Sequence, residues 1–302
     1  MRSQSWYDGW CTQAQVIGLS FFGILLGTSS VLGETHEIAM TAIEKEVVID
    51  GVETAYKAWT FNTQFRGPVV RVTEGDTIKI TLTNPSSNAY PHAIDFHAAE
   101  IDFLKGHRAI TPGETISSTF VAKKPGVLFY HCGAPSMIQH VARGMIGAII
   151  VDPLNASAWP KADREYVLVQ SEFFKNVDDT PAMLDRKFDN RISTGGILKC
   201  HPFVTSGGNL DAKPGERVRM YVVNAGPNAF SAFHPISEIW DNVYENGNLS
   251  NKFTGVQTYP VRLGSASTFD TVVESAEASS LATHSLTGTL RGAIAVLVVS
   301  PD

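Results

Sequence analysis

The chain contains 302 residues, 43% of them hydrophobic, and its formal net charge is −6. This composition supports a packed core and excludes a disordered or collagen-like chain, and the negative charge argues against nucleic acid as a partner. The cysteines are Cys11, Cys132 and Cys200, and the chain has no Cys-x-x-Cys pair, which argues against a zinc ribbon, a thioredoxin-type redox pair and a disulfide scaffold.

The first 33 residues predict an export signal. Arg2 precedes an apolar run from Val16 to about Leu32, and small residues end the run at Gly33. This order is typical of a secretory signal peptide cleaved after Gly33, and the run is also just long enough for an uncleaved membrane anchor. We therefore expect an exported protein, periplasmic or otherwise extracytoplasmic, with residues 1–33 either removed or anchoring it to the membrane.

From residue 34 onward the pattern is that of β-strands. Residues Thr77–Thr83 alternate apolar and polar side chains, which gives a strand one buried face and one solvent-exposed face. Turn signals recur at Gly75-Asp76, Pro112-Gly113 and Pro125-Gly126, and long helical periodicity is hard to find. The expected fold class is all-β, built as a β-sandwich.

An internal repeat doubles this unit. Residues 74–84 are echoed by residues 214–224, and the stretch that starts at Gly147 is echoed by the one that starts at Gly292. Such a long period predicts two similar sandwiches in tandem and not a solenoid. We expect a first domain at 34–153, a linker at 154–163 and a second domain at 164–302.

The first unit contains the ligand set of a blue copper site. His92 comes first, and Cys132, His140 and Met145 follow together near the end of the repeat. Two histidines and a cysteine form the trigonal centre of such a site, methionine is its weak axial ligand, and the soft thiolate favours copper. The alternative is a buried thiol with unrelated core histidines and methionine.

His97 and His131 are left over from this set. Because successive residues of a strand face opposite ways, His131 should point away from the metal held by Cys132 and could bind a second metal. Two adjacent residues would then link the two metals covalently. His97 can join His131 if the chain bends after His92.

The second unit has lost its own blue copper site but keeps histidines. Ser285 stands where Cys132 stands in the first unit, and the stretch that carries the ligands is shortened. His284 matches His131, and His234 lies near the position of His97. We expect these outward-facing histidines to serve a metal that is shared with another part of the assembly.

At this point the sequence resembles the copper-containing nitrite reductases, from about residue 36 to the C-terminus. The resemblance includes ligands for both copper sites in order. It rests on the segments Trp59–Asn62, Pro91–Ala99, Tyr130–Cys132, His140–Met145 and Phe233–Ile239. It implies two tandem cupredoxin-like Greek-key β-sandwich domains, a homotrimer, and a second copper between subunits.

The resemblance also implies roles for individual residues. The type 1 copper ligands would be His92, Cys132, His140 and Met145. The type 2 copper ligands would be His97 and His131 of one subunit and His284 of its neighbour. Asp95 and His234 match the family's acid-base pair, and Ile236 matches the apolar residue that caps the substrate. Asp95 could also orient a ligand histidine.

The implied activity is the one-electron reduction of nitrite to nitric oxide and water, as in denitrification. The electron would come from a small redox protein, a cupredoxin or a c-type cytochrome, and would pass from type 1 copper through Cys132 and His131 to type 2 copper. Two alternatives remain open: a two-domain, laccase-like multicopper oxidase and a blue-copper electron carrier without enzymatic activity. The oxidase needs His-x-His pairs, and the sequence has none. The carrier leaves Asp95, His97 and His284 unexplained.

Several residues depart from the family pattern or fall outside it. Gln139 stands where many members have tryptophan beside the ligand, and the Ala-Ser-rich stretch before His284 makes it the least secure ligand. His107 and His201 are expected to be ordinary surface or core residues. His36 would be third from a free amine after cleavage at Gly33, and such a histidine can chelate Cu(II).

Overall fold

The computed structural model describes residues 33–48, 55–62, 66–174, 197–201, 210–290 and 292–301. Residues 1–32 of the predicted signal peptide or anchor lie outside the described residues. None of the helices within them is both long and apolar enough to cross a bilayer.

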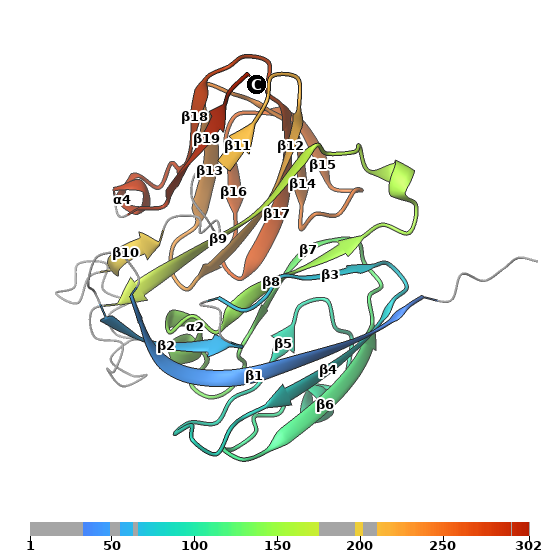
Figure 1. Ribbon diagram of the computed structural model, residues 1–302, viewed down its shortest axis with the longest axis vertical. Coiled ribbons are helices and arrows are strands. Elements are labelled where there is room, and N and C mark those ends of the chain that lie inside the picture. The colour runs from blue at the N-terminus through green and yellow to red at the C-terminus, as the bar shows by residue number, and fades with distance from the viewer. Residues whose placement is uncertain are drawn as a thin grey trace, which may run out of the picture. The chain divides into compact units, whose positions relative to one another are not determined.

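The described residues between 35 and 152 form one sandwich of two four-stranded sheets. Figure 1 shows it in blue to green. The first sheet has the order β2 (Ala55–Phe61), β1 (Thr35–Val48), β4 (Thr77–Thr83), β6 (Thr115–Val121). The second has the order β3 (Val70–Thr73), β8 (Ile146–Asp152), β7 (Gly126–His131), β5 (Asp95–Phe96). Two short helices, α1 (Phe103–Gly106) and α2 (Met137–Ala142), lie in the connections.

After the 3-10 helix η1 (Ala156–Ala158), the described residues between 164 and 299 form a second sandwich. Figure 1 shows its strands in yellow to red. One sheet has the order β10 (Ile197–His201), β9 (Arg164–Phe174), β12 (Arg217–Gly226), β17 (Ser265–Val272), β14 (Trp240–Glu245), β15 (Lys252–Val256). The other has the order β11 (Leu210–Ala212), β19 (Ile294–Val299), β18 (Ala278–Thr283), β13 (Ser231–Ile236), β16 (Tyr259–Val261). The helix α4 (Leu286–Thr289) follows β18.

The predicted repeat is visible in the strand pairing. Strand β4 pairs with β1 in parallel and with β6 antiparallel, and β12 pairs with β9 and β17 in the same way. The closing strands β8 and β19 both take a parallel partner, β3 and β11. In β4 the predicted alternation holds, because Ile78, Ile80 and Leu82 are buried. The all-β prediction of two tandem sandwiches is therefore confirmed.

Strand β7 contacts both sandwiches. Tyr130 belongs to the core of the first sandwich, whereas Val127 and Phe129 pack with Tyr221 and other residues of the second. At Gly126, whose φ is 144°, an added Cβ would lie 2.3 Å from the backbone oxygen of Asn246. Only glycine permits this close approach. Because successive side chains of a strand face opposite ways, one face of β7 packs against each half of the chain.

Buried charges hold the connection between the sandwiches. Arg219 donates to both carboxylate oxygens of Asp270 at 2.7 Å and to the Pro160 carbonyl at 2.7 Å. Its guanidinium also lies 4.2 Å from the centre of the Trp159 ring. The side chains of Arg219 and Asp270 are 5% and 0% exposed, so each charge depends on the other for its stabilisation.

We predict that Asp270→Ala lowers the free energy of unfolding by about 3–5 kcal/mol, because it leaves a buried cation without its counter-charge. Urea denaturation measures this loss. The control is Glu37→Ala, which removes the exposed ion pair with Lys79 and should leave stability unchanged. A loss for Asp270→Ala no larger than that of the control would contradict the assigned role of the pair.

Candidate metal centres

The side chains of His92, Cys132 and His140 meet inside the first sandwich. Their ligand atoms all lie within 4.8 Å of one another, and the residues are 0%, 0% and 1% exposed. Cys132 Sγ lies 3.1 Å from His140 Nδ1 and accepts a hydrogen bond from the Ala93 N–H at 3.3 Å. Three predicted type 1 ligands are thus brought together by segments that are distant in sequence.

Strand β7 and the turn after α2 position these residues. Cys132 follows the last residue of β7, and its N–H donates to the Met145 carbonyl at 3.0 Å. Met145 is 0% exposed and belongs to the same core cluster as Cys132, whereas Met137 is 49% exposed. Burial therefore favours Met145 over Met137 as the axial residue.

His92 lies outside any strand of the first sandwich. It forms an isolated bridge with Ile110, in which each N–H donates to the other's carbonyl, at 3.0 and 2.8 Å. The expectation that the chain bends after His92 is consistent with this placement, because β5 begins only at Asp95.

The donor atoms of this cluster fit a copper ion. His92 Nδ1 is buried and lacks a hydrogen-bond partner within the described part of the chain. A buried nitrogen without a partner is costly unless a ligand satisfies it, and a His2Cys set is the one that copper prefers. Trp59 covers the cluster, with its ring 4.6 Å from that of His140 and 5.4 Å from that of His92.

Burial also sets the protonation of the ligands. It raises the pKa of the Cys132 thiol to about 12. Burial, together with the neighbouring His92, lowers the pKa of His140 to about 3. At neutral pH the metal-free cluster therefore holds a protonated thiol and a neutral His140 imidazole.

Asp95, His97 and His131 form a second group of ligand atoms within 4.8 Å of one another. Asp95 pairs with His131 in the register of β5 and β7, and the His97 N–H donates to the Phe129 carbonyl at 3.0 Å. The rings of His97 and His131 are 5.2 Å apart. The Nδ1 of His131 lies 3.0 Å from the Cys132 carbonyl oxygen, to which it donates, so Nε2 is left available to a metal.

Contacts within the chain orient His97 as well. Its pKa is lowered because neighbouring atoms exclude water from part of the ring and because His131 lies beside it. A hydrogen bond also joins the ring to the backbone of Gly264 in the second sandwich. Neutral, oriented imidazoles are the form that binds metal ions.

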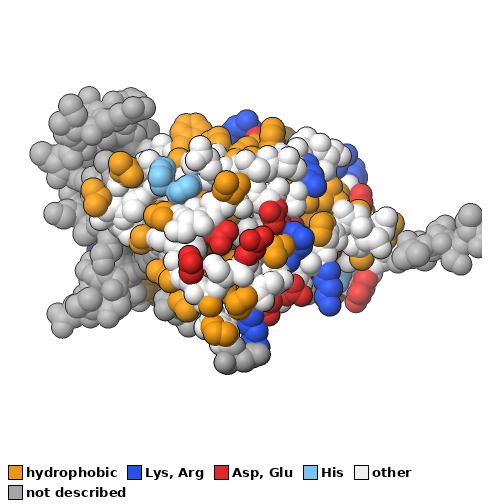
Figure 2. Space-filling view, turned by 90° about the horizontal axis from the view of Figure 1, so that it is seen from above, with side chains coloured by type: hydrophobic (Ala, Val, Ile, Leu, Met, Phe, Trp, Pro, Cys, Tyr) orange, Lys and Arg blue, Asp and Glu red, His pale blue; other side chains and the backbone are white. Residues whose placement is uncertain are grey.

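His284 belongs to a separate site on the second sandwich. It is absent from the group formed by Asp95, His97 and His131 within one chain, and its ring lies 4.4 Å from that of His234. Within one chain, His234 therefore lies beside His284, whereas Asp95 lies beside His97 and His131. Close to His234 and His284 in sequence are the exposed apolar side chains of Ile236, Leu286 and Leu290. Figure 2 views the molecule from above, where histidine side chains lie among hydrophobic ones.

The structure reveals two neighbours of the predicted site that the sequence pattern did not mark. His107 Nδ1 lies 2.9 Å from the Ile94 carbonyl oxygen and 3.7 Å from Asp95 Oδ1, which places this core histidine beside the second group of ligand atoms. Glu44 Oε1 lies 3.0 Å from His92 Nε2. Neither residue shares a short motif with the ligands, so no spacing signal could have found them.

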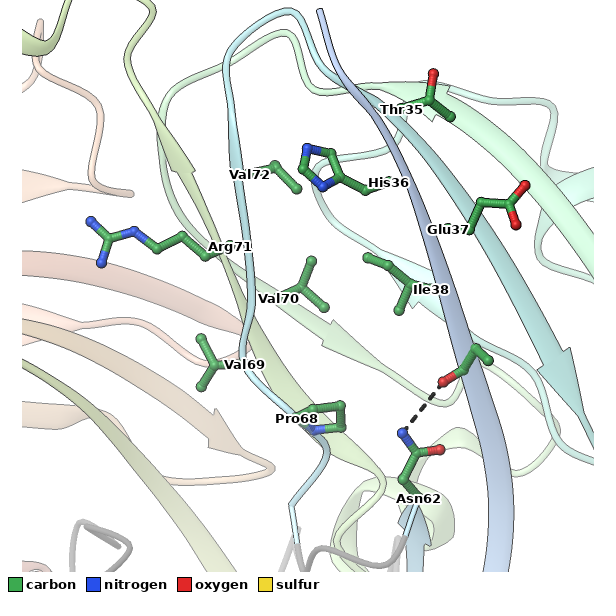
Figure 3. Close-up of a pocket in the computed structure, with 11 residues that line it drawn as sticks. Thr35, His36, Glu37, Ile38, Asn62, Pro68, Val69, Val70, Arg71 and Val72 are labelled. Carbon is green, nitrogen blue, oxygen red and sulfur yellow. Dashed lines mark hydrogen bonds between the residues drawn. The ribbon is translucent and has the colours of Figure 1, made fainter.

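A groove of about 450 Å³ lies between β1 and β3, apart from both groups of ligand atoms. Figure 3 shows its lining residues, with the Asn62 amide donating to the Ala39 carbonyl. His36 lies in this groove and pairs with Asp76 at 2.8 Å. This hydrogen bond gives His36 a structural role at the start of β1. Copper chelation by His36 stays an untested hypothesis.

This chain is similar to known copper proteins over most of its length. A multicopper oxidase family model matches residues 42–156. A copper-containing nitrite reductase of Neisseria meningitidis is 36% identical over 257 residues, which cover 82% of this chain and 64% of that protein. One from Cereibacter sphaeroides is 34% identical, covering 76% of this chain and 67% of that protein. The solved copper nitrite reductase of Nitrosomonas europaea is 44% identical, with a TM-score of 0.80, covering 89% of this chain and 95% of that one.

This chain spans 64% of the length of the Neisseria meningitidis relative, which is just under two thirds. The solved structure from Nitrosomonas europaea, by contrast, is covered to 95%.

We predict that copper binding to the metal-free protein at pH 7.5 releases about one proton per chain more in the wild type than in Cys132→Ser. The thiol, with its pKa raised to about 12, must lose its proton to bind as a thiolate, whereas His140 has none to lose. Calorimetry in buffers of different ionisation enthalpy counts the protons. Equal release by both proteins would contradict a ligand role for Cys132.

Proposed function

The chain belongs to the copper-containing nitrite reductases, and on this premise we propose that it reduces nitrite to nitric oxide and water. The observation that carries the proposal is the adjacency of Cys132 and His131, which contribute to two different groups of ligand atoms. A carrier protein needs only the first group. The second group, with a carboxylate beside two imidazoles, supports a site where nitrite reacts.

The residues that would hold copper follow from the two groups. His92, Cys132, His140 and Met145 would bind type 1 copper, and His97 and His131 would bind type 2 copper together with His284 of the partner subunit. When bound, copper would supply the electron transfer and would polarise the substrate. Three imidazoles leave a position open for nitrite, as catalytic metal sites do.

The link between the two groups is short. The peptide bond between His131 and Cys132 connects them covalently, and the His131 ring also donates to the Cys132 carbonyl at 3.0 Å. An electron from a small redox protein, a cupredoxin or a c-type cytochrome, would thus reach the nitrite site through bonds of this chain alone.

Asp95 and His234 are suited to deliver the two protons that nitrite reduction consumes. The Asp95 side chain is 34% exposed and lies 3.8 Å from His131, so it is in reach of both solvent and substrate. His234 Nδ1 lies 2.6 Å from the Gln257 carbonyl oxygen, to which it donates, and Nε2 is then free to exchange a proton. Ile236, exposed on the same strand, would cap the substrate.

We propose a homotrimer in which this site is shared. In one chain His284 and His234 lie apart from His97 and His131, so the type 2 site is incomplete without a neighbour. Exposed apolar residues on the second sandwich, such as Ile239 and Leu290, supply surface for such an interface. A head-to-tail contact that closes on itself gives a ring of identical subunits.

We also propose that the protein works outside the cytoplasm, since residues 1–33 carry the pattern of an export signal. The multicopper oxidase alternative has the support of the family model over residues 42–156. Because the sequence lacks the His-x-His pairs of a trinuclear cluster, nitrite reduction is the better supported activity.

Asp95→Asn keeps the shape of the side chain but cannot carry a proton, so we expect turnover of nitrite to fall by about 10² to 10⁴. Copper content should not change. The matched control is Asp102→Asn, a similar change at an exposed helix cap that asparagine fills equally well. Near-normal turnover of Asp95→Asn would return Asp95 to a structural role.

His284→Ala should keep the type 1 absorption and lose type 2 copper, because two imidazoles hold a metal far less tightly than three. A second variant, His97→Ala with His131→Ala, should be inactive for the same reason. If the site is shared, dissociating and reassociating the two variants together should restore part of the activity.

The control for that mixture is each variant dissociated and reassociated alone, which should stay inactive. Mass measurement confirms that mixed oligomers have formed. Confirmed mixed oligomers without activity and without a type 2 copper signal would show that the site lies within one chain.

A further inference from the structure

The carboxylate of Glu44 lies beside the His92 ring. Glu44 belongs to β1, opposite Trp59 in β2, and its Oε1 is 3.0 Å from His92 Nε2. A carboxylate only accepts, so the His92 Nε2–H donates to it. This leaves the lone pair on His92 Nδ1, the buried nitrogen without a hydrogen-bond partner in the described residues. Glu44 therefore selects the tautomer that can bind copper.

Glu44 is fixed in this position by the chain around it. The Ala89 N–H donates to both carboxylate oxygens, at 3.2 and 3.1 Å, and the Tyr90 N–H donates to Oε1 at 3.0 Å. The loop that carries these donors is itself held, because the Asn88 amide donates to the Ala42 carbonyl at 2.9 Å. With its side chain 16% exposed, Glu44 keeps its contact with His92 instead of turning to solvent.

The three ligand side chains are those of His92, Cys132 and His140. Among the described residues, Glu44 is the one charged group that forms a hydrogen bond with any of them, and its partner is His92. The His140 ring bonds to the Pro135 backbone, and Cys132 Sγ accepts from the Ala93 N–H, so both of these partners are neutral. Hydrogen bonds to a charged group are roughly twice as strong as neutral ones, and they are stronger still where water is excluded. His92 is fully buried, at 0% exposed.

We infer that Glu44 is a positioning residue that lowers the reduction potential of the copper held by His92, Cys132 and His140. The inference rests on the proposed copper site. A carboxylate that accepts from an imidazole ligand increases the electron density that the ligand donates, and it adds a negative charge next to the metal. Both effects favour Cu(II) over Cu(I), so removing the charge should favour the reduced state.

The test is the midpoint potential of the type 1 copper in Glu44→Gln, measured by titration of its visible absorption. Gln keeps the size of the side chain and loses its charge. We expect the absorption to persist and the equilibrium to shift roughly tenfold toward the reduced state. For one electron, a tenfold shift is an increase of about 59 mV.

The matched control is Glu46→Gln. Glu46 is an exposed residue on the same face of the same strand, so the change in net charge is identical but no ligand is touched. Solvent and salt screen this exposed charge, and its removal should shift the equilibrium by less than about twofold. An equal shift in both variants would overturn the inference, since net charge alone would then explain the effect.

Glu44→Asp provides a second variant that keeps the charge but draws it back from His92. We expect its potential to lie between those of the wild type and Glu44→Gln. If Glu44→Gln does not fold, an unchanged potential in Glu44→Asp overturns the inference. The inference is also overturned if Glu44→Gln keeps its absorption and its redox equilibrium lies within about twofold of that of the wild type. Absence of thiolate absorption in the wild type would instead contradict the proposed copper site itself.

Discussion

The end of strand β7 is the feature on which the rest of the site depends. Successive residues of a strand face opposite ways, so Cys132 enters the core of the first sandwich while His131 lies on the side that meets the second. A shift of one residue in the pairing of β7 with β5 and β8 would exchange these faces. The register of this strand therefore determines which residues can form each group of ligand atoms.

The packing between the sandwiches holds this register in place. Gly126 approaches the backbone of Asn246 too closely for any side chain, and Arg71 of the first sandwich pairs with Glu165 of the second at 2.7 Å. Gly264, which also belongs to the second sandwich, bonds to the His97 ring. The second sandwich thus has two roles in our account: it orients a ligand of its own chain, and it would offer His284 to a neighbour.

Local pattern was enough to predict much of this structure. The alternation at Thr77–Thr83 and the repeat beginning near Gly215 gave the strands and the tandem sandwiches, and a resemblance added the cupredoxin family. What local pattern could not show was pairing between distant segments. His92 lies at an isolated bridge to Ile110, and Glu44 reaches His92 only because β1 and the loop before His92 meet in the folded chain. The contact between His107 and Asp95 likewise joins segments that no short motif links.

The central claim is that each chain contributes ligands to two linked copper sites and that the assembled protein reduces nitrite. Metal analysis of the purified oligomer, combined with a nitric oxide electrode, tests it most directly. We expect two copper ions per chain and nitric oxide release from nitrite in the presence of a reductant. One copper per chain without nitric oxide would indicate an electron carrier, and four with consumption of dioxygen would indicate an oxidase. Either result would contradict the account.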